Sequence, residues 1–168
     1  VGSEMCIRDR MAGIGDGKFA PALTTTRAMV AEVLYEAEGA PSVEGMTCPL
    51  TDIKAGEWYT DAVIWAYNAG VVAGRGDGTF CPDDTITRQE MAKVLYGYDK
   101  IGGKTAEGIT EKLTYTDLDA IADWALEAVT YCTAEKYLAG SNGAFSPKGT
   151  ATRAMGAKVL MNMTKEAA

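Results

Sequence analysis

The chain contains no histidine among its 168 residues. This absence removes the Ser-His-Asp and Cys-His pairs on which many nucleophilic enzymes depend, and it removes the commonest zinc ligand. Basic residues are also few, since 16 Lys and Arg stand against 23 Asp and Glu and give a net charge of −7. A chain with this charge lacks the basic surface that neutralises phosphates, so nucleic acid is not an expected partner.

Long apolar runs and paired cysteine motifs are missing as well. No apolar stretch approaches the roughly 20 residues of a membrane span, so no membrane insertion is expected. The N-terminus lacks the charged start and long apolar stretch of a secretory signal. The four cysteines, Cys6, Cys48, Cys81 and Cys132, form no C-x-x-C motif. We interpret them mostly as small buried apolar residues, which leaves the redox compartment undecided.

What the chain does contain fits a globular protein, because 47% of its residues are hydrophobic and 23% are charged. The length suits one domain or a few small repeats that share a core. Residues 1–10 (VGSEMCIRDR) match no later segment and resemble a translated sequencing adaptor. We predict that they are a non-native or disordered tail, outside the fold.

Three segments of the chain are alike: residues 15–35 (GDGKFAPALTTTRAMVAEVLY), 76–96 (GDGTFCPDDTITRQEMAKVLY) and 141–161 (SNGAFSPKGTATRAMGAKVLM). All three keep Gly, Phe, Pro, a Thr-Arg pair and a Val-Leu pair in register without a gap. Upstream of the last two, Asp52 aligns with Asp117 and Trp58 with Trp124. The chain is therefore predicted to contain a partial first repeat (11–47), a second repeat (48–100) and a third repeat (113–164).

Each repeat is predicted to be a helix, a turn-rich loop and a second helix. In the second repeat, residues 61–69 carry an apolar stripe at helical spacing and Gly70 supplies a left-handed stop. The second helix begins at Thr87, where Glu90 completes a capping box; the other repeats have Met at that place and keep only the threonine cap. One such unit cannot bury its apolar stripes alone, so the three units are expected to pack together.

These residues resemble the S-layer homology (SLH) domains of bacterial surface proteins. The family signature has an Asp beside an aliphatic residue, a Trp, a Gly-rich loop ending in Phe-x-Pro, and an Ile-Thr-Arg-Ala-Glu helix start. Here it reads Thr51-Asp52-Ile53, Trp58, residues 74–82 (GRGDGTFCP) and residues 86–90 (ITRQE). The resemblance extends over nearly the whole chain after Met11. It implies a mostly helical, pseudo-threefold bundle of tandem helix–loop–helix repeats, with the first repeat incomplete.

The resemblance also implies a function. SLH domains are non-catalytic, need no cofactor, and anchor extracellular proteins to the cell wall. They bind secondary cell-wall polysaccharide, notably a terminal pyruvylated N-acetylmannosamine, in grooves between adjacent units. An effector domain is then expected elsewhere in the full-length chain. Carried over to this sequence, the glycan-binding residues are Arg27, Arg88, Arg153, Asp52, Asp117, Trp58, Trp124, Gly76 and Asp77.

The chemistry of these residues suits that ligand, although each has a structural alternative. A guanidinium fork can hold a planar carboxylate with two hydrogen bonds, and a Trp face suits a pyranose ring. The arginines could instead be solvated or salt-bridged surface residues, and the two aspartates could cap the segments that enter the first helices. For Trp58 and Trp124 we favour a role as core anchors.

The first repeat lacks the Asp motif and the Trp helix, so one groove should lack a wall, and the junction of the second and third repeats is the expected best site. A structural or oligomerising module with degenerate glycan sites is the alternative function. A glycan hydrolase with two carboxylates is disfavoured, because no pair of acids stands out from the repeats. The Asp-Gly loops lack the alternating ligands of a calcium loop, and no metal site is expected.

Overall fold

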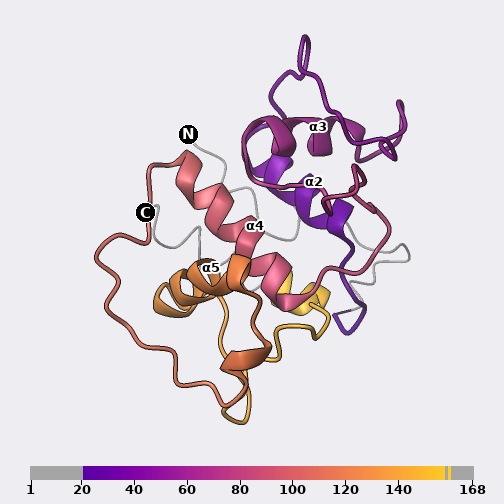
Figure 1. Cartoon of the computed structure of the whole chain (residues 1–168). Helices are drawn as coiled ribbons and strands as arrows, with labels where there is room; N and C mark the ends of the chain where they lie inside the picture. Colours follow the sequence, from indigo (N-terminus) through magenta and orange to yellow (C-terminus); the bar gives the residue numbers. More distant parts are fainter. Residues whose placement is uncertain (1–20, 158, 160–168) are drawn as a thin grey trace, which may run out of the picture.

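The computed structural model describes residues 21–157 and 159. Its elements are α2 (Arg27–Ala37), α3 (Thr60–Asn68), α4 (Arg88–Ile101), the short 3-10 helix η1 (Leu118–Ala120) and α5 (Asp123–Ala134), after which residues 153–157 and 159 are again helical (Figure 1). Within this part of the chain there is no strand, which confirms the mostly helical class. None of the described helices is both long and apolar enough to cross a membrane. The predicted tail lies outside the described residues.

The helices begin and end where the sequence predicts. Thr87 accepts the amide of Glu90 at 3.3 Å and the Glu90 carboxylate accepts the amide of Thr87 at 2.8 Å, which completes the predicted capping box. In the other two repeats Thr26 and Thr152 accept the amide three residues further on, at 3.2 and 3.3 Å. Gly70 follows α3 with a φ of 74°, the left-handed stop that glycine adopts without strain.

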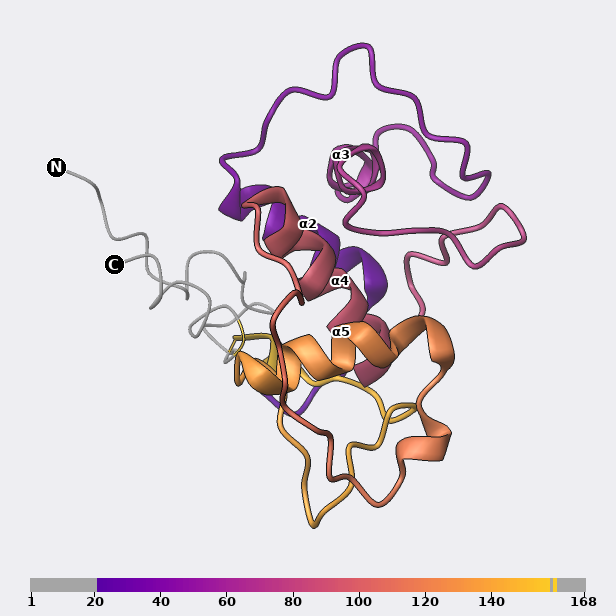
Figure 2. The same ribbon diagram turned by 60° about the vertical axis from the view of Figure 1, so that its left-hand side comes forward.

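The main helix contacts join neighbouring repeats. α2 of the first repeat packs on α3 of the second, and α4 of the second packs on α5 of the third (Figures 1 and 2). Equivalent aromatic pairs mark the two contacts: Tyr35 and Trp65 have ring centroids 5.8 Å apart, and Tyr96 and Tyr131 have centroids 4.6 Å apart. Trp65 is buried, as its place on the apolar stripe predicts. The first repeat therefore completes its core with a helix of the second, and the second with a helix of the third.

A closed ring of backbone hydrogen bonds joins the three repeats at their helix starts. The amide of Thr25 donates to Ala151 at 2.9 Å, that of Ala151 to Ile86 at 3.0 Å, and that of Ile86 to Thr25 at 2.9 Å. The three residues hold the same position in the three repeats, one before the capping threonine. This cycle confirms the predicted pseudo-threefold arrangement, with each repeat donating to one neighbour and accepting from the other.

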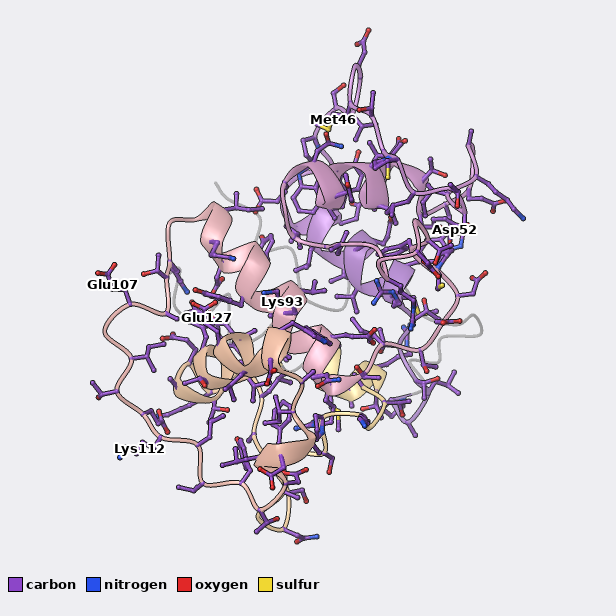
Figure 3. All side chains as sticks on the ribbon, in the orientation of Figure 1. Met46, Asp52, Lys93, Glu107, Lys112 and Glu127 are labelled. Atoms are coloured by element: carbon purple, nitrogen blue, oxygen red, sulfur yellow. The ribbon has the colours of Figure 1, made fainter. Side chains whose placement is uncertain are left out.

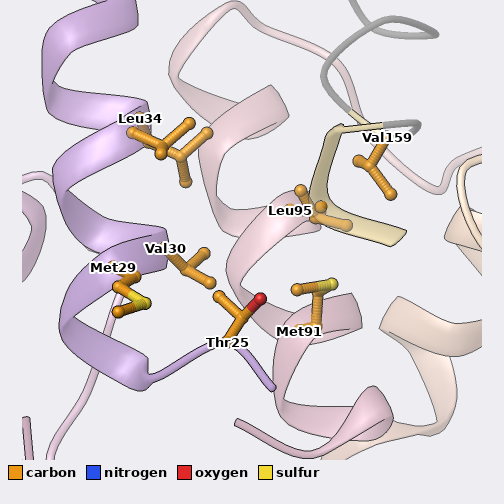
Figure 4. A pocket seen from close by; sticks show the side chains of 9 residues that line it. Thr25, Met29, Val30, Leu34, Met91, Leu95 and Val159 are labelled. Carbon is orange, nitrogen blue, oxygen red and sulfur yellow. The ribbon is translucent and has the colours of Figure 1, made fainter. Parts of the chain in front are cut away.

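A cavity of about 20 Å³ lies where α2, α4 and the helix of the third repeat converge (Figure 4). Most of its lining is apolar, including Met29, the residue that replaces the motif glutamate in the first repeat. The buried hydroxyl of Thr25 beside it has no hydrogen-bond partner among the described residues. A space of this size holds at most one water molecule, so it belongs to the core and is no ligand site.

The described cysteines are unpaired. Cys132 is fully buried, as predicted, and its thiol donates to the carbonyl of Ala92 at 3.5 Å. Cys48 and Cys81 are only half-buried, because both lie in loops. Cys6 lies outside the described residues.

Candidate functional site

Asp52 and Asp117 each hold the glycine-rich loop of their own repeat. The Asp52 carboxylate accepts the amides of Phe80 and Cys81 at 2.7 and 2.6 Å. Asp117 makes the equivalent pair of bonds in the third repeat, at 2.8 and 2.7 Å. The amide of Phe145, the first of these donors, lowers the pKa of the Asp117 carboxyl. The predicted alternative role as helix caps is therefore wrong, since the carboxylates bind loop amides.

The Arg27 side chain reaches from the start of α2 into the loop of the second repeat. Its Nε donates to the carbonyl of Phe80 at 2.7 Å, Nη2 to Ala73 at 3.1 Å, and Nη1 to the Glu90 carboxylate at 3.0 Å. The guanidinium lies 4.7 Å from the centre of the Phe80 ring. Burial lowers the pKa of Arg27, and the charge of Glu90 opposes that shift. A solvated surface role is wrong for this arginine, which is 7% exposed, whereas the salt bridge that the alternative also allowed is present, with Glu90.

Arg88 repeats this arrangement at the junction of the second and third repeats, with one change. Its Nε donates to Phe145 at 2.7 Å and Nη2 to the carbonyl of Ala139 at 2.8 Å. Nη1 faces the sulfur of Met155 at 3.5 Å, where Arg27 has a carboxylate. Burial lowers the pKa of Arg88 as well. The change of one residue, Glu to Met, leaves this buried cation beside a weak acceptor.

Arg153 occupies the third equivalent position. Its amide donates to the carbonyl of Leu23 at 2.9 Å, just as the amide of Arg27 donates to Asp84 at 2.9 Å. Its side chain is also buried. The loop of the first repeat that corresponds to the arginine-binding loops, residues 15–20, lies outside the described residues.

A groove of about 540 Å³ lies over the junction of the first and second repeats. We call it the Arg27 groove. It draws its lining from all three repeats: Arg27 from the first; Val71, Val72, Ala73, Gly74, Arg75, Gly76, Phe80, Ile86, Glu90, Lys93 and Val94 from the second; and Trp124 from the third. Of the predicted site residues it therefore brings together Arg27, Gly76 and Trp124.

This position differs from the junction of the second and third repeats that the sequence favours. The Trp that lines the Arg27 groove comes from the repeat after the one that supplies the loop. By the same rotation, a groove at Arg88 would be lined by a Trp of the first repeat, and the described residues of that repeat, from residue 21 on, contain no Trp.

Trp58 and Trp124 are 55% and 50% exposed. The prediction that they anchor the core is wrong, because Trp65 and Tyr131 fill the equivalent core positions on α3 and α5. Trp58 precedes α3 and makes an edge-on contact with Tyr59, at 5.3 Å between ring centroids. Each exposed indole leaves an open aromatic face for a ligand.

Asp77, the remaining predicted residue, lies in the loop of the second repeat but does not line the Arg27 groove. Its carboxylate accepts the amide and the hydroxyl of Thr79 at 2.9 and 2.6 Å. The Thr79 hydroxyl and then its amide lower the pKa of Asp77. This local turn shapes the loop.

The sequence analysis missed two cations of the Arg27 groove. Arg75 pairs with Asp84 at 3.0 Å and approaches Glu90 at 3.8 Å. Lys93 is exposed on α4 and forms no ion pair with any described residue (Figure 3). The sequence does contain a signal for Lys93. It lies three residues after Glu90 and therefore on the same face of the helix, one turn further along.

The sequence profile of the S-layer homology domain matches residues 49–92 and 114–154, which are the second and third repeats. The chain belongs to this family. It is similar to the amylopullulanase of Thermoanaerobacterium thermosulfurigenes, with 30% identity over 161 residues that cover 95% of this chain and 8% of that protein. It is also similar to the cellulosome-anchoring protein of Acetivibrio thermocellus (30% identity; 86% and 33%) and to the S-layer protein sap of Bacillus anthracis (27%; 92% and 18%).

The chain thus spans a third or less of these relatives. The enzyme names among them describe large proteins of which the matched part is a small share. Membership of the SLH family makes this chain a non-catalytic module for cell-wall anchoring at the cell surface.

Proposed function

We propose that this module binds an anionic secondary cell-wall polysaccharide, with a pyruvylated amino sugar as the recognised unit, in the Arg27 groove. The observation that carries the proposal is that an exposed Trp124 and three cations line the same groove. An indole face suits the apolar side of a pyranose, and the cations suit its acidic substituent. The volume of about 540 Å³ is ordinary for a small-molecule site.

The other predicted residues have roles that follow from their contacts. Asp52 and Arg27 hold the loop from its two sides, so we propose that they shape the groove. Gly76 and Asp77 form the tip of that loop. Gly76 has a φ of 89°, a conformation that glycine tolerates best.

Two further grooves are proposed on the same plan. Arg88 and Asp117 would form one at the junction of the second and third repeats. Arg153 and Trp58 would form another at the junction of the third and first repeats. We propose that the Arg27 groove is the principal site, because Trp124 and the cations Arg27, Arg75 and Lys93 line one groove there.

Binding to purified cell-wall sacculi tests this function. The protein should be retained by native sacculi and released from sacculi whose polysaccharide has been stripped chemically. Trp124→Ala should weaken binding by about 2 kcal/mol, or about 30-fold, as for a typical aromatic hot spot. Because Trp124 is half exposed, its loss should leave the circular dichroism spectrum unchanged. Equal retention on stripped and native walls would contradict glycan anchoring.

A structural or oligomerising module with degenerate glycan sites is the second candidate, and the contact of Arg88 with Met155 favours it at that junction. Under this alternative, the mass measured by analytical ultracentrifugation should rise with protein concentration, and Trp124→Ala should leave wall binding unchanged. We further propose that an effector domain accompanies the module in the full-length protein, as the enzyme names of some relatives suggest.

A further inference from the structure

The Arg27 groove contains an uncompensated charge, and it is not on the motif arginine. We infer that Lys93 binds the acidic group of the glycan and that Arg27 is a positioning residue. This inference rests on the proposed function, because it assigns the parts of the same groove. It reverses the role that the Thr-Arg motif alone suggests for this site.

All three nitrogens of Arg27 already donate hydrogen bonds. Two of them hold the carbonyls of Ala73 and Phe80, at the two ends of the loop, and the third holds Glu90. Three of the five N–H groups of the guanidinium are thereby engaged, and the side chain that carries the remaining two is only 8% exposed. An incoming carboxylate therefore reaches Arg27 less readily than it reaches an exposed cation of the same groove. Arg27 therefore fixes the shape of the loop and its charge is balanced by Glu90.

The two outer cations differ from each other. Arg75 is 38% exposed and pairs with Asp84 at 3.0 Å. Lys93 lines the same groove as Trp124 and has no carboxylate within 4.0 Å among the described residues. The two arginines of the groove thus have acidic partners, and the Lys93 ammonium is the charge left over. An anionic ligand gains most at that charge, because it displaces no existing ion pair.

The occupant that fits is a sugar with one acidic substituent at its edge. Its ring would lie on Trp124, and the acid would meet the ammonium of Lys93. A lysine is a flexible point charge that accepts a carboxylate or a phosphate equally well. The shared chemistry is therefore a monoanionic sugar, and separate removal of each acid identifies its source.

Isothermal titration with soluble wall-polysaccharide fragments tests the inference. Three preparations are compared: native fragments, fragments freed of ketal-linked pyruvate by mild acid, and fragments treated with a phosphatase. Lys93→Ala should weaken binding of native fragments by about 5-fold, the upper range for one partly exposed ion pair. It should leave unchanged the binding of whichever preparation has lost the relevant acid. Lys100→Ala is the matched control, since it removes the same charge from α4 at a residue whose ammonium lies over the Tyr96 ring, 4.6 Å from its centre, and does not line the groove.

Arg27→Lys separates positioning from direct contact. It keeps the charge but loses the fork, so it should lower the thermal midpoint and weaken binding of native and acid-free fragments by the same factor. If Arg27→Lys impairs only the acid-bearing fragments, or if Lys93→Ala binds native fragments as tightly as Lys100→Ala does, the assignment is overturned while glycan binding stands. If the unaltered protein binds none of the fragments, the proposed function itself fails.

Discussion

A buried polar cluster fastens α4 to the third repeat, and it offers a direct test of how this junction is stabilised. The Asp99 carboxylate, 7% exposed, accepts hydrogen bonds from the hydroxyls of Tyr131 and Tyr137 through one oxygen, both at 2.7 Å. The ammonium of Lys104 lies 3.4 Å from the same oxygen. Burial, and then the bond to Asp99, raise the pKa of Tyr131, so its phenol remains a donor well into the alkaline range.

Tyr137→Phe removes one of the two phenol donors and keeps the ring. A hydrogen bond to a charged group contributes about 1.5–3 kcal/mol, and here the acceptor stays buried after its donor is lost. For a chain of this size each kcal/mol lowers the thermal midpoint by about 2–4 °C. We therefore expect a fall of about 3–12 °C for Tyr137→Phe.

Thermal unfolding followed by circular dichroism measures this effect. Tyr35→Phe is the control, because the Tyr35 hydroxyl donates to a neutral acceptor, the carbonyl of Pro41, at 2.9 Å. Its loss should cost about 0.5–1.5 kcal/mol, the usual range for a neutral bond. If Tyr137→Phe lowers the midpoint no more than Tyr35→Phe does, the carboxylate does not carry the stabilisation assigned to it.

Three further predictions concern single residues of the scaffold. Thr87→Ala should destabilise the protein by about 1 kcal/mol in urea unfolding, and by more than Thr26→Ala, which breaks only half of a capping box. Gly74→Ala should cost about 1–3 kcal/mol in the same assay, because a Cβ there would lie 2.9 Å from the carbonyl oxygen of Thr79. The lowered pKa of Asp117 gives stability that is present above its unfolded value of about 4 and lost as pH falls through the folded value. Thermal midpoints measured from pH 7 down to pH 2 should therefore fall less steeply below pH 4 for Asp117→Asn than for the unaltered protein.

The repeats could be recognised in the sequence because the copies form the same local structure with the same residue types. The capping threonines, the glycine stop after α3 and the apolar stripe with Trp65 are short-range features, and all of them stand in the structure as predicted. The spacing of a few residues along the chain is enough to predict each of these features. The mostly helical, threefold fold follows once three such units must share one core.

The site was less predictable, because its parts come from different repeats. Nothing local in the sequence says that Arg27 enters the loop of the second repeat, or that Trp124 of the third repeat lines the same groove. The predicted burial of Trp124 failed for a related reason: an aromatic residue at a helix start is compatible with either face, and only the packing of α5 against α4 selects one. Lys93 belongs to no motif of the sequence, and only the folded groove brings it together with Arg27 and Trp124.

The arginine contacts run in one direction along the repeats. The first repeat donates its arginine to the loop of the second, and the second donates its arginine to the loop of the third. The Arg27 groove is lined by residues of all three repeats, although its loop and arginine belong to only two. The backbone ring through Thr25, Ile86 and Ala151 enforces this dependence, since no repeat can shift without breaking a bond to each neighbour. A displacement of the third repeat would therefore disturb the Arg27 groove as well, because Trp124 comes from that repeat.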